Sequence, residues 1–184
     1  YDTLLPEMAR HGIRLVSIED LTATEWQTVD QFFESQVFPV LTPLAVDPGH
    51  PFPYISNLSL SLAVQIHDPA TGAVRFARVK VPKSLPRWIP FGRGNTFIPL
   101  EQVIGANLGA LFPGMDIQGF NTFRVTRYSD LELTHSEDED NLLQLIEEQV
   151  FERRFAEVVR IEVETGMPEK LREQFLFEPG QHLT

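Results

Sequence analysis

Apolar and polar residues alternate most regularly between residues 58 and 81. Every second position at the start of this segment is apolar: Leu58, Leu60, Leu62, Val64 and Ile66. This is the period of a strand with one buried face. The alternation resumes over residues 74–81, after the turn-forming sequence DPATG at residues 68–72. We therefore predict an antiparallel hairpin of strands 58–67 and 74–81, with the first strand half-buried.

Helical spacing of apolar residues marks several other segments. A short helix is predicted over residues 4–11. A second helix begins after Thr22, whose spacing to Glu25 is that of a capping box, and continues to Val37. Further helices are predicted over residues 99–111, 136–150 and 168–176.

The remaining segments indicate the fold class. Strands are predicted over residues 13–17, 120–126 and 157–164. Residues 39–56 are predicted to form an ordered loop, because five prolines there remove backbone donors and fix φ. A βαβ rhythm and a Gly-rich first turn are both missing from the sequence. We expect an α+β fold, a single domain with a mainly antiparallel sheet and flanking helices.

Composition narrows the range of functions. A length of 184 residues suits one domain, and no apolar run approaches the roughly 18 residues of a membrane span. The absence of cysteine excludes disulfides and thiolate metal sites within these residues. The formal net charge of -11 disfavours a nucleic-acid partner, because the overall potential repels polyanions.

Motifs for catalysis or metal binding are missing from the sequence. The five histidines are scattered and make no HxxxH or HExxH pair, and no phosphate-binding glycine loop or GxSxG motif occurs. Eight carboxylates lie between residues 130 and 148. We interpret them as the solvated start of a helix, with a metal site as the alternative. No catalytic residue and no metal ligand is assigned.

One segment opposes the overall charge of the chain. Residues 75–95 contain no acidic residue and six basic ones: Arg75, Arg78, Lys80, Lys83, Arg87 and Arg93. In a strand, Arg78 and Lys80 share a face about 7 Å apart, comparable with the charge spacing of a phosphate chain. The alternative is a solvated or partner-paired face. Three aromatic residues lie among these basic residues: Trp88, Phe91 and Phe97. They are interpreted either as stacking on a base or as packing in a small cluster beside the main core.

Several longer motifs resemble one protein family, the polyphosphate kinases. The most specific are FPVLTPLAVDP at residues 38–48, HPFPYISNLS at residues 50–59 and FRVTRYSD at residues 123–130. The similarity extends to LPEMARHGI at residues 5–13, VKVP at residues 79–82 and MPEKL at residues 167–171. The resemblance therefore covers nearly the whole chain.

The resemblance implies a fragment of a larger enzyme. In this family a head, or middle, domain lies between an N-terminal helical domain and two C-terminal catalytic domains. We expect residues 1–178 to be the head domain and residues 179–184 to be a frayed tail leading toward the catalytic domains. The family enzyme reversibly transfers the terminal phosphate of ATP to polyphosphate, with magnesium, through a phosphohistidine in the C-terminal domains. The fragment is thus expected to be inactive and to carry no cofactor, with ATP and Mg²⁺ belonging to the parent enzyme.

The resemblance also suggests partners for the chain. They are the remaining domains of the parent, a second copy in a homodimer, and polyphosphate and ATP through the parent. The head domain would frame the active-site tunnel, and the strand of Leu58, Leu60 and Leu62 would pair through an exposed edge or face. The basic residues of segment 75–95 are the candidate polyphosphate or nucleotide site. The expected location is cytoplasmic, with peripheral membrane association of the full-length protein as an alternative.

Two other functions stay open at this stage. The chain could be a free-standing module that binds a polyanion through the basic stretch from Arg75 to Arg93. It could also be an enzyme that is active without further domains. Polyphosphate binding after charge reversal at Arg78 and Lys80 tests the first, and incubation with ATP and magnesium tests the second.

Overall fold

A computed structural model describes residues 3–46, 54–92, 94–128 and 157–176. The α-helices are α1 (Leu4–Arg10), α2 (Ala23–Phe32), α3 (Leu100–Ala106), α4 (Leu108–Leu111) and α6 (Glu169–Leu176). The strands are β1 (Ile13–Leu15), β2 (Pro43–Val46), β3 (Leu60–His67), β4 (Val74–Lys80), β5 (Trp88–Pro90), β6 (Asn95–Pro99), β7 (Asp116–Arg127) and β8 (Val158–Val163). The predicted helix over 136–150 and the tail 179–184 lie outside these residues.

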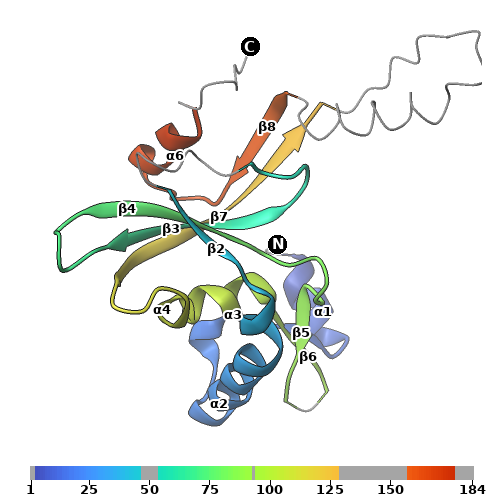
Figure 1. Ribbon diagram of the computed structural model, residues 1–184. Helices are drawn as coiled ribbons and strands as arrows, with labels where there is room; N and C mark the ends of the chain where they lie inside the picture. Colours follow the sequence, from blue (N-terminus) through green and yellow to red (C-terminus); the bar gives the residue numbers. More distant parts are fainter. Residues whose placement is uncertain (1–2, 47–53, 93, 129–156, 177–184) are drawn as a thin grey trace, which may run out of the picture.

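Within the described residues the strands form two sheets (Figure 1). The larger has the order β2-β4-β3-β7-β8, and all its neighbours are antiparallel. The smaller has the order β1-β6-β5, with β1 parallel to β6. The architecture is α+β with mostly antiparallel strands, as the sequence predicts.

The predicted hairpin is present as β3 and β4. Ser61 pairs with Lys80 at one end and His67 with Val74 at the other. The turn between them depends on Asp68, whose Oδ1 accepts a hydrogen bond of 2.9 Å from the Ala70 N–H. Such an Asx turn uses the short side chain to replace a backbone acceptor, which explains why DPATG turns the chain at this point.

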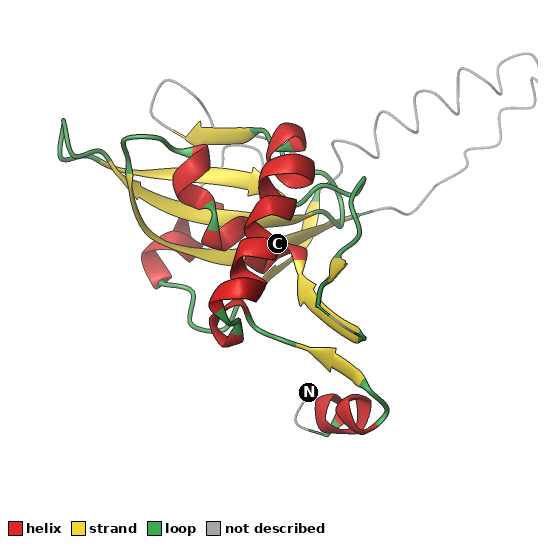
Figure 2. Ribbon diagram, turned by 90° about the horizontal axis from the view of Figure 1, so that it is seen from below, coloured by secondary structure: helices red, strands yellow, loops and turns green. Residues whose placement is uncertain are grey.

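Helices cover both faces of the larger sheet (Figures 1 and 2). On one face α2, α3 and α4 pack on alternate residues of β3, including Leu62 and Val64. On the other face α6 contributes Leu171 to a second cluster with Ala63 and Phe123. Each fully buried aliphatic or aromatic side chain stabilises the fold by about 1.5–3 kcal/mol.

Two expectations about β3 are wrong. The strand is buried on both faces rather than one, because Leu62 and Ala63 are equally inaccessible to solvent. Both of its edges are also paired, since β3 lies between β4 and β7. An exposed edge or face of this strand therefore cannot bring two chains together.

The second predicted helix starts as expected but ends earlier. The Thr22 hydroxyl accepts from the Glu25 N–H, and the Glu25 carboxylate accepts from the Thr22 N–H, so the capping box is complete. The α-helix ends at Phe32 and continues as a π-helical turn over Phe33–Val37.

The helix predicted over residues 99–111 is interrupted at Asn107, between α3 and α4. The side-chain amide of Asn107 donates to the Val103 carbonyl at 3.0 Å, and an asparagine that bonds its own backbone competes with helix continuation.

The prediction of a loop over residues 39–56 is only partly right. The segment includes most of a 3-10 turn (Phe38–Val40) and all of β2. Pro43 is tolerated in β2 because this strand lies at the edge of the sheet. The sequence also did not predict β5 and β6. No helix in the part of the chain that the structure describes is long and apolar enough to cross a membrane.

Candidate functional site

The basic residues of segment 75–95 lie in different environments in the fold. Arg75 lies 4.0 Å from the Asp68 carboxylate, and Arg87 lies 2.9 Å from the Glu101 carboxylate. Acidic residues from outside the segment thus pair with two of its cations. The sequence of the segment alone does not predict these pairs. Lys83 is exposed, and Arg93 lies outside the described residues.

Arg78 is the buried member of the set. Only 4% of its surface is exposed. Its Nε donates to the Ser61 hydroxyl at 3.2 Å, and its Nη1 donates to the Tyr54 carbonyl at 2.8 Å. Its Nη2 is buried and has no hydrogen-bond partner among the described residues. Burial lowers the pKa of this guanidinium, because a low-dielectric environment disfavours its charge.

Lys80 follows Arg78 on the same face of β4. Its ammonium donates to the Ser56 hydroxyl at 3.2 Å. The pKa of Lys80 lies below its ordinary value, first because of partial burial and then because Arg78 and Lys83 repel a further positive charge. Positive charge is therefore concentrated at this end of β4.

Arg78 and Lys80 line a hollow of about 180 Å³ at the sheet edge. We call it the basic hollow, and its lining residues are Val40, Thr42, Leu44, Arg78, Lys80 and Pro82. The sheet register explains this set. Leu44 of β2 stands opposite Arg78 of β4, so alternate residues before and after them project from the same face.

Residues 54–59 cross this face of the sheet beside the hollow and are held by cations. Besides Arg78 and Lys80, Arg127 of β7 donates from Nε to the Ile55 carbonyl at 2.9 Å. Its guanidinium carbon also lies 4.6 Å from the centre of the Tyr54 ring, a cation–π distance. Sequence reasoning missed Arg127 as part of this site. Its place in the FRVTRYSD motif, on the same face as Phe123 and Val125, is the signal that could have identified it.

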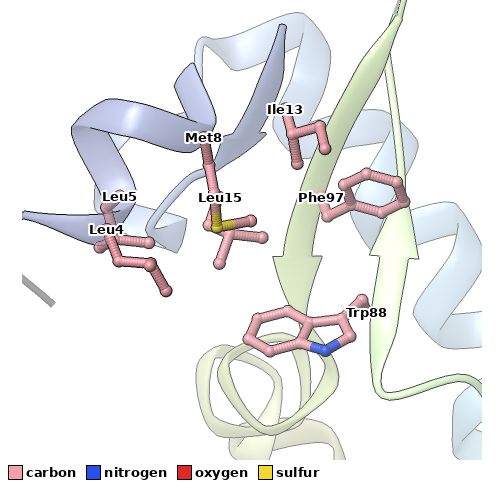
Figure 3. Close-up of a pocket in the computed structure, with 7 residues that line it drawn as sticks. All are labelled: Leu4, Leu5, Met8, Ile13, Leu15, Trp88 and Phe97. Atoms are coloured by element: carbon pink, nitrogen blue, oxygen red, sulfur yellow. The ribbon is translucent and has the colours of Figure 1, made fainter. Parts of the chain in front are cut away.

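A second hollow lies where α1 meets the smaller sheet (Figure 3). Its volume is about 560 Å³, and it is lined by Leu4, Leu5, Met8, Ile13, Leu15, Trp88 and Phe97. We call it the apolar hollow. Trp88 is 43% exposed and Leu4 65% exposed. The Arg87 guanidinium lies 5.8 Å from the Trp88 ring. Of the three aromatics considered for base stacking, Phe91 is instead buried in the core.

Potential metal ligands do not gather into a cluster among the described residues. Among them no three His, Cys, Asp or Glu residues come close enough to hold a metal ion. His67 lies 3.2 Å from the Asp116 carboxylate, and His11 lies 3.5 Å from the Glu7 carboxylate, which also pairs with Arg10. The other three histidines and the acidic tract 130–148 lie outside the described residues. No step of phosphoryl transfer can be derived from this arrangement.

Comparison with known proteins gives a consistent result. A family model described as the polyphosphate kinase middle domain matches residues 24–179. The chain is 48% identical to the polyphosphate kinase of Thermosynechococcus vestitus, over 93% of this chain and 24% of that protein. It is 44% identical to the polyphosphate kinase of Mycobacterium ulcerans, over 98% of this chain and 26% of that protein. The chain thus spans about a quarter of the length of these relatives.

A solved structure has the same fold. The crystal structure of polyphosphate kinase from Porphyromonas gingivalis aligns with a TM-score of 0.68, at 20% sequence identity. The alignment covers 100% of this chain and 27% of that one. At this level of identity the likeness concerns the fold alone.

Proposed function

Because the chain belongs to the polyphosphate kinase family and matches its middle domain, we propose that it is part of an enzyme that transfers the terminal phosphate of ATP reversibly to polyphosphate. Magnesium and ATP belong to that larger enzyme. Residues 1–178 constitute the middle domain in this proposal, and residues 179–184 lead toward the catalytic domains. Its location is the cytoplasm, with peripheral membrane association as the alternative.

The domain itself serves as a scaffold rather than as a source of reacting groups. Phosphoryl transfer requires clustered cations, a metal and a positioned nucleophile. The two histidines of the described residues, His11 and His67, each lie beside a single carboxylate and not beside a cationic cluster. The family resemblance assigns the nucleophile of the parent to its other domains.

The single observation that carries the scaffold role is the apolar hollow. Water-exposed apolar surface is unfavourable, and a rimmed apolar depression is typical of a contact surface. Trp88 and Leu4 would lose their exposure on docking. The occupant we propose is another part of the same polypeptide, since this chain spans only about a quarter of its relatives' length. A second copy of the chain, in a homodimer that frames the active-site tunnel, is the alternative occupant.

The proposal is tested by comparing the isolated chain with the full-length protein. Each is incubated with ATP, magnesium and a polyphosphate primer, and ADP and polymer are measured. We expect product from the full-length protein and none above background from the isolated chain. Polymer synthesis by the isolated chain would contradict the scaffold role, and its absence from the full-length protein would contradict the kinase assignment. Light scattering of the isolated chain identifies a dimer.

A further inference from the structure

The basic hollow combines two positive charges with no negative charge from the described residues. The partners of Arg78 are a hydroxyl and a carbonyl oxygen, and the partner of Lys80 is a hydroxyl. Arg75, three residues before Arg78 in β4, instead lies beside the carboxylate of Asp68. A buried charge without a counterion is costly, so proteins usually pair such a group. The hollow that Arg78 and Lys80 line is the space in which an anion from solution could pair with these charges.

The guanidinium of Arg78 is already fixed in position. Nε and Nη1 are held by Ser61 and Tyr54, and Nη2 remains as a donor without a partner among the described residues. A rigid planar donor group is well suited to tetrahedral oxyanions, which accept several hydrogen bonds from it. The hydroxyl of Thr42 in the same lining can add a further donor.

The size of the hollow limits what it can hold. Its volume of about 180 Å³ is below the roughly 300–1,000 Å³ of pockets that enclose whole drug-sized ligands. The chain also carries a formal net charge of -11, so it repels anions in general. An anion that binds must therefore be held by local donors and must place only a small group in the hollow.

We propose that the basic hollow binds a phosphate group, with Arg78 as the buried donor and Lys80 at the exposed rim. The inference rests on the geometry of this sheet edge and stands without the kinase proposal. Free phosphate, one unit of a polyphosphate chain and the terminal phosphate of a nucleotide share this chemistry. The hollow accepts the phosphate group and leaves the rest of a longer ligand outside.

The test is a calorimetric titration of the 184-residue chain with inorganic phosphate, tripolyphosphate and ATP, at low ionic strength. Lys80→Gln removes the rim charge, and Arg75→Gln is the matched control, because it removes one charge from the same strand outside the hollow. We expect saturable binding of at least one of the three, weakened about tenfold or more by Lys80→Gln and less than about twofold by Arg75→Gln.

A second variant keeps the inference testable at the buried position. Arg78→Met replaces the guanidinium by a shorter, unbranched apolar side chain, and circular dichroism shows whether the variant is folded. In the folded variant, the rise in melting temperature that the ligand causes in the wild type should disappear. Tighter binding of tripolyphosphate than of phosphate identifies a chain as the ligand, and preference for ATP identifies a nucleotide. Absence of saturable binding by the wild type, or equal weakening by Arg75→Gln and Lys80→Gln, would overturn the proposal.

Discussion

Gly105 of α3 lies directly against the ring of Phe120 in β7. A Cβ atom added to Gly105 would come within 2.1 Å of the Phe120 Cζ, far inside van der Waals contact. The missing side chain at residue 105 therefore allows α3 to approach the sheet closely, and α3 supplies Val103 and Ile104 to the core on this face.

The first prediction concerns this close approach. Gly105→Ala should lower the free energy of unfolding by about 1–3 kcal/mol, because the ring of Phe120 or the helix must move. Gly109→Ala in α4 is the matched control, since a Cβ there meets nothing within 4 Å. The control should be neutral or slightly stabilising, as alanine is the better helix former. Urea denaturation of both variants measures the difference, and equal stabilities would refute the packing argument.

The second prediction concerns the start of α2. Thr22→Ala removes the side-chain acceptor of the capping box and should destabilise the chain by about 1 kcal/mol. Thr24→Ala, inside the first turn of the same helix, removes no cap and should change stability little. Thermal unfolding of the two variants compares them. A Thr24→Ala loss as large as that of Thr22→Ala would show that the cap is not the cause.

The third prediction concerns pH. The pKa of Asp68 lies below its ordinary value, first because the Thr71 hydroxyl donates to it and then because the Ala70 N–H does. The folded chain thus binds this proton more weakly than the unfolded chain. The resulting stabilisation is complete above the unfolded pKa of about 3.9 and is lost as the pH falls through the lower folded value.

Asp68→Asn provides the check on this pH dependence. The amide oxygen of asparagine can still accept from the Ala70 N–H, so the turn is retained while the titrating group is removed. The variant should lose less stability than the wild type between about pH 4 and pH 2, measured by chemical denaturation. Parallel curves for the two proteins would exclude Asp68 as a contributor.

Local patterns predicted local structure well. The hairpin of β3 and β4 follows from period-two alternation and from Asp68 at the turn, and both features lie within one continuous segment. The capping box at Thr22 also involves neighbours in sequence. The burial of both faces of β3 was not predictable in this way, because Met167 and Leu171, which cover its second face, lie about a hundred residues further along the chain.

In the candidate site, too, local features were predictable from the sequence and contacts between distant residues were not. Period-two spacing correctly placed Arg78 and Lys80 on one face of a strand. It could not predict that residues 54–59 cover Arg78. The acidic partners Asp68 and Glu101 lie outside the basic segment, so its apparent excess charge is smaller in the fold. The apolar hollow joins α1 to Trp88 and Phe97 across more than seventy residues, and no local pattern indicates such a contact.

The central claim is that this domain acts by docking through the apolar hollow, and Leu4→Glu in the full-length protein tests it most directly. The matched control is Val74→Glu, which alters another exposed apolar residue, 59% exposed against 65% for Leu4, at the start of β4 and outside the hollow. Both substitutions affect exposed positions, so each should change the stability of the isolated chain by no more than about 0.5 kcal/mol.

The measurement is the rate of polyphosphate synthesis from ATP by the two full-length variants and the wild type. A charge placed in a buried apolar contact is strongly unfavourable, so we predict that Leu4→Glu lowers the rate about tenfold or more while Val74→Glu leaves it unchanged. Full activity of Leu4→Glu, or an equal loss in Val74→Glu, would contradict the docking role of the apolar hollow.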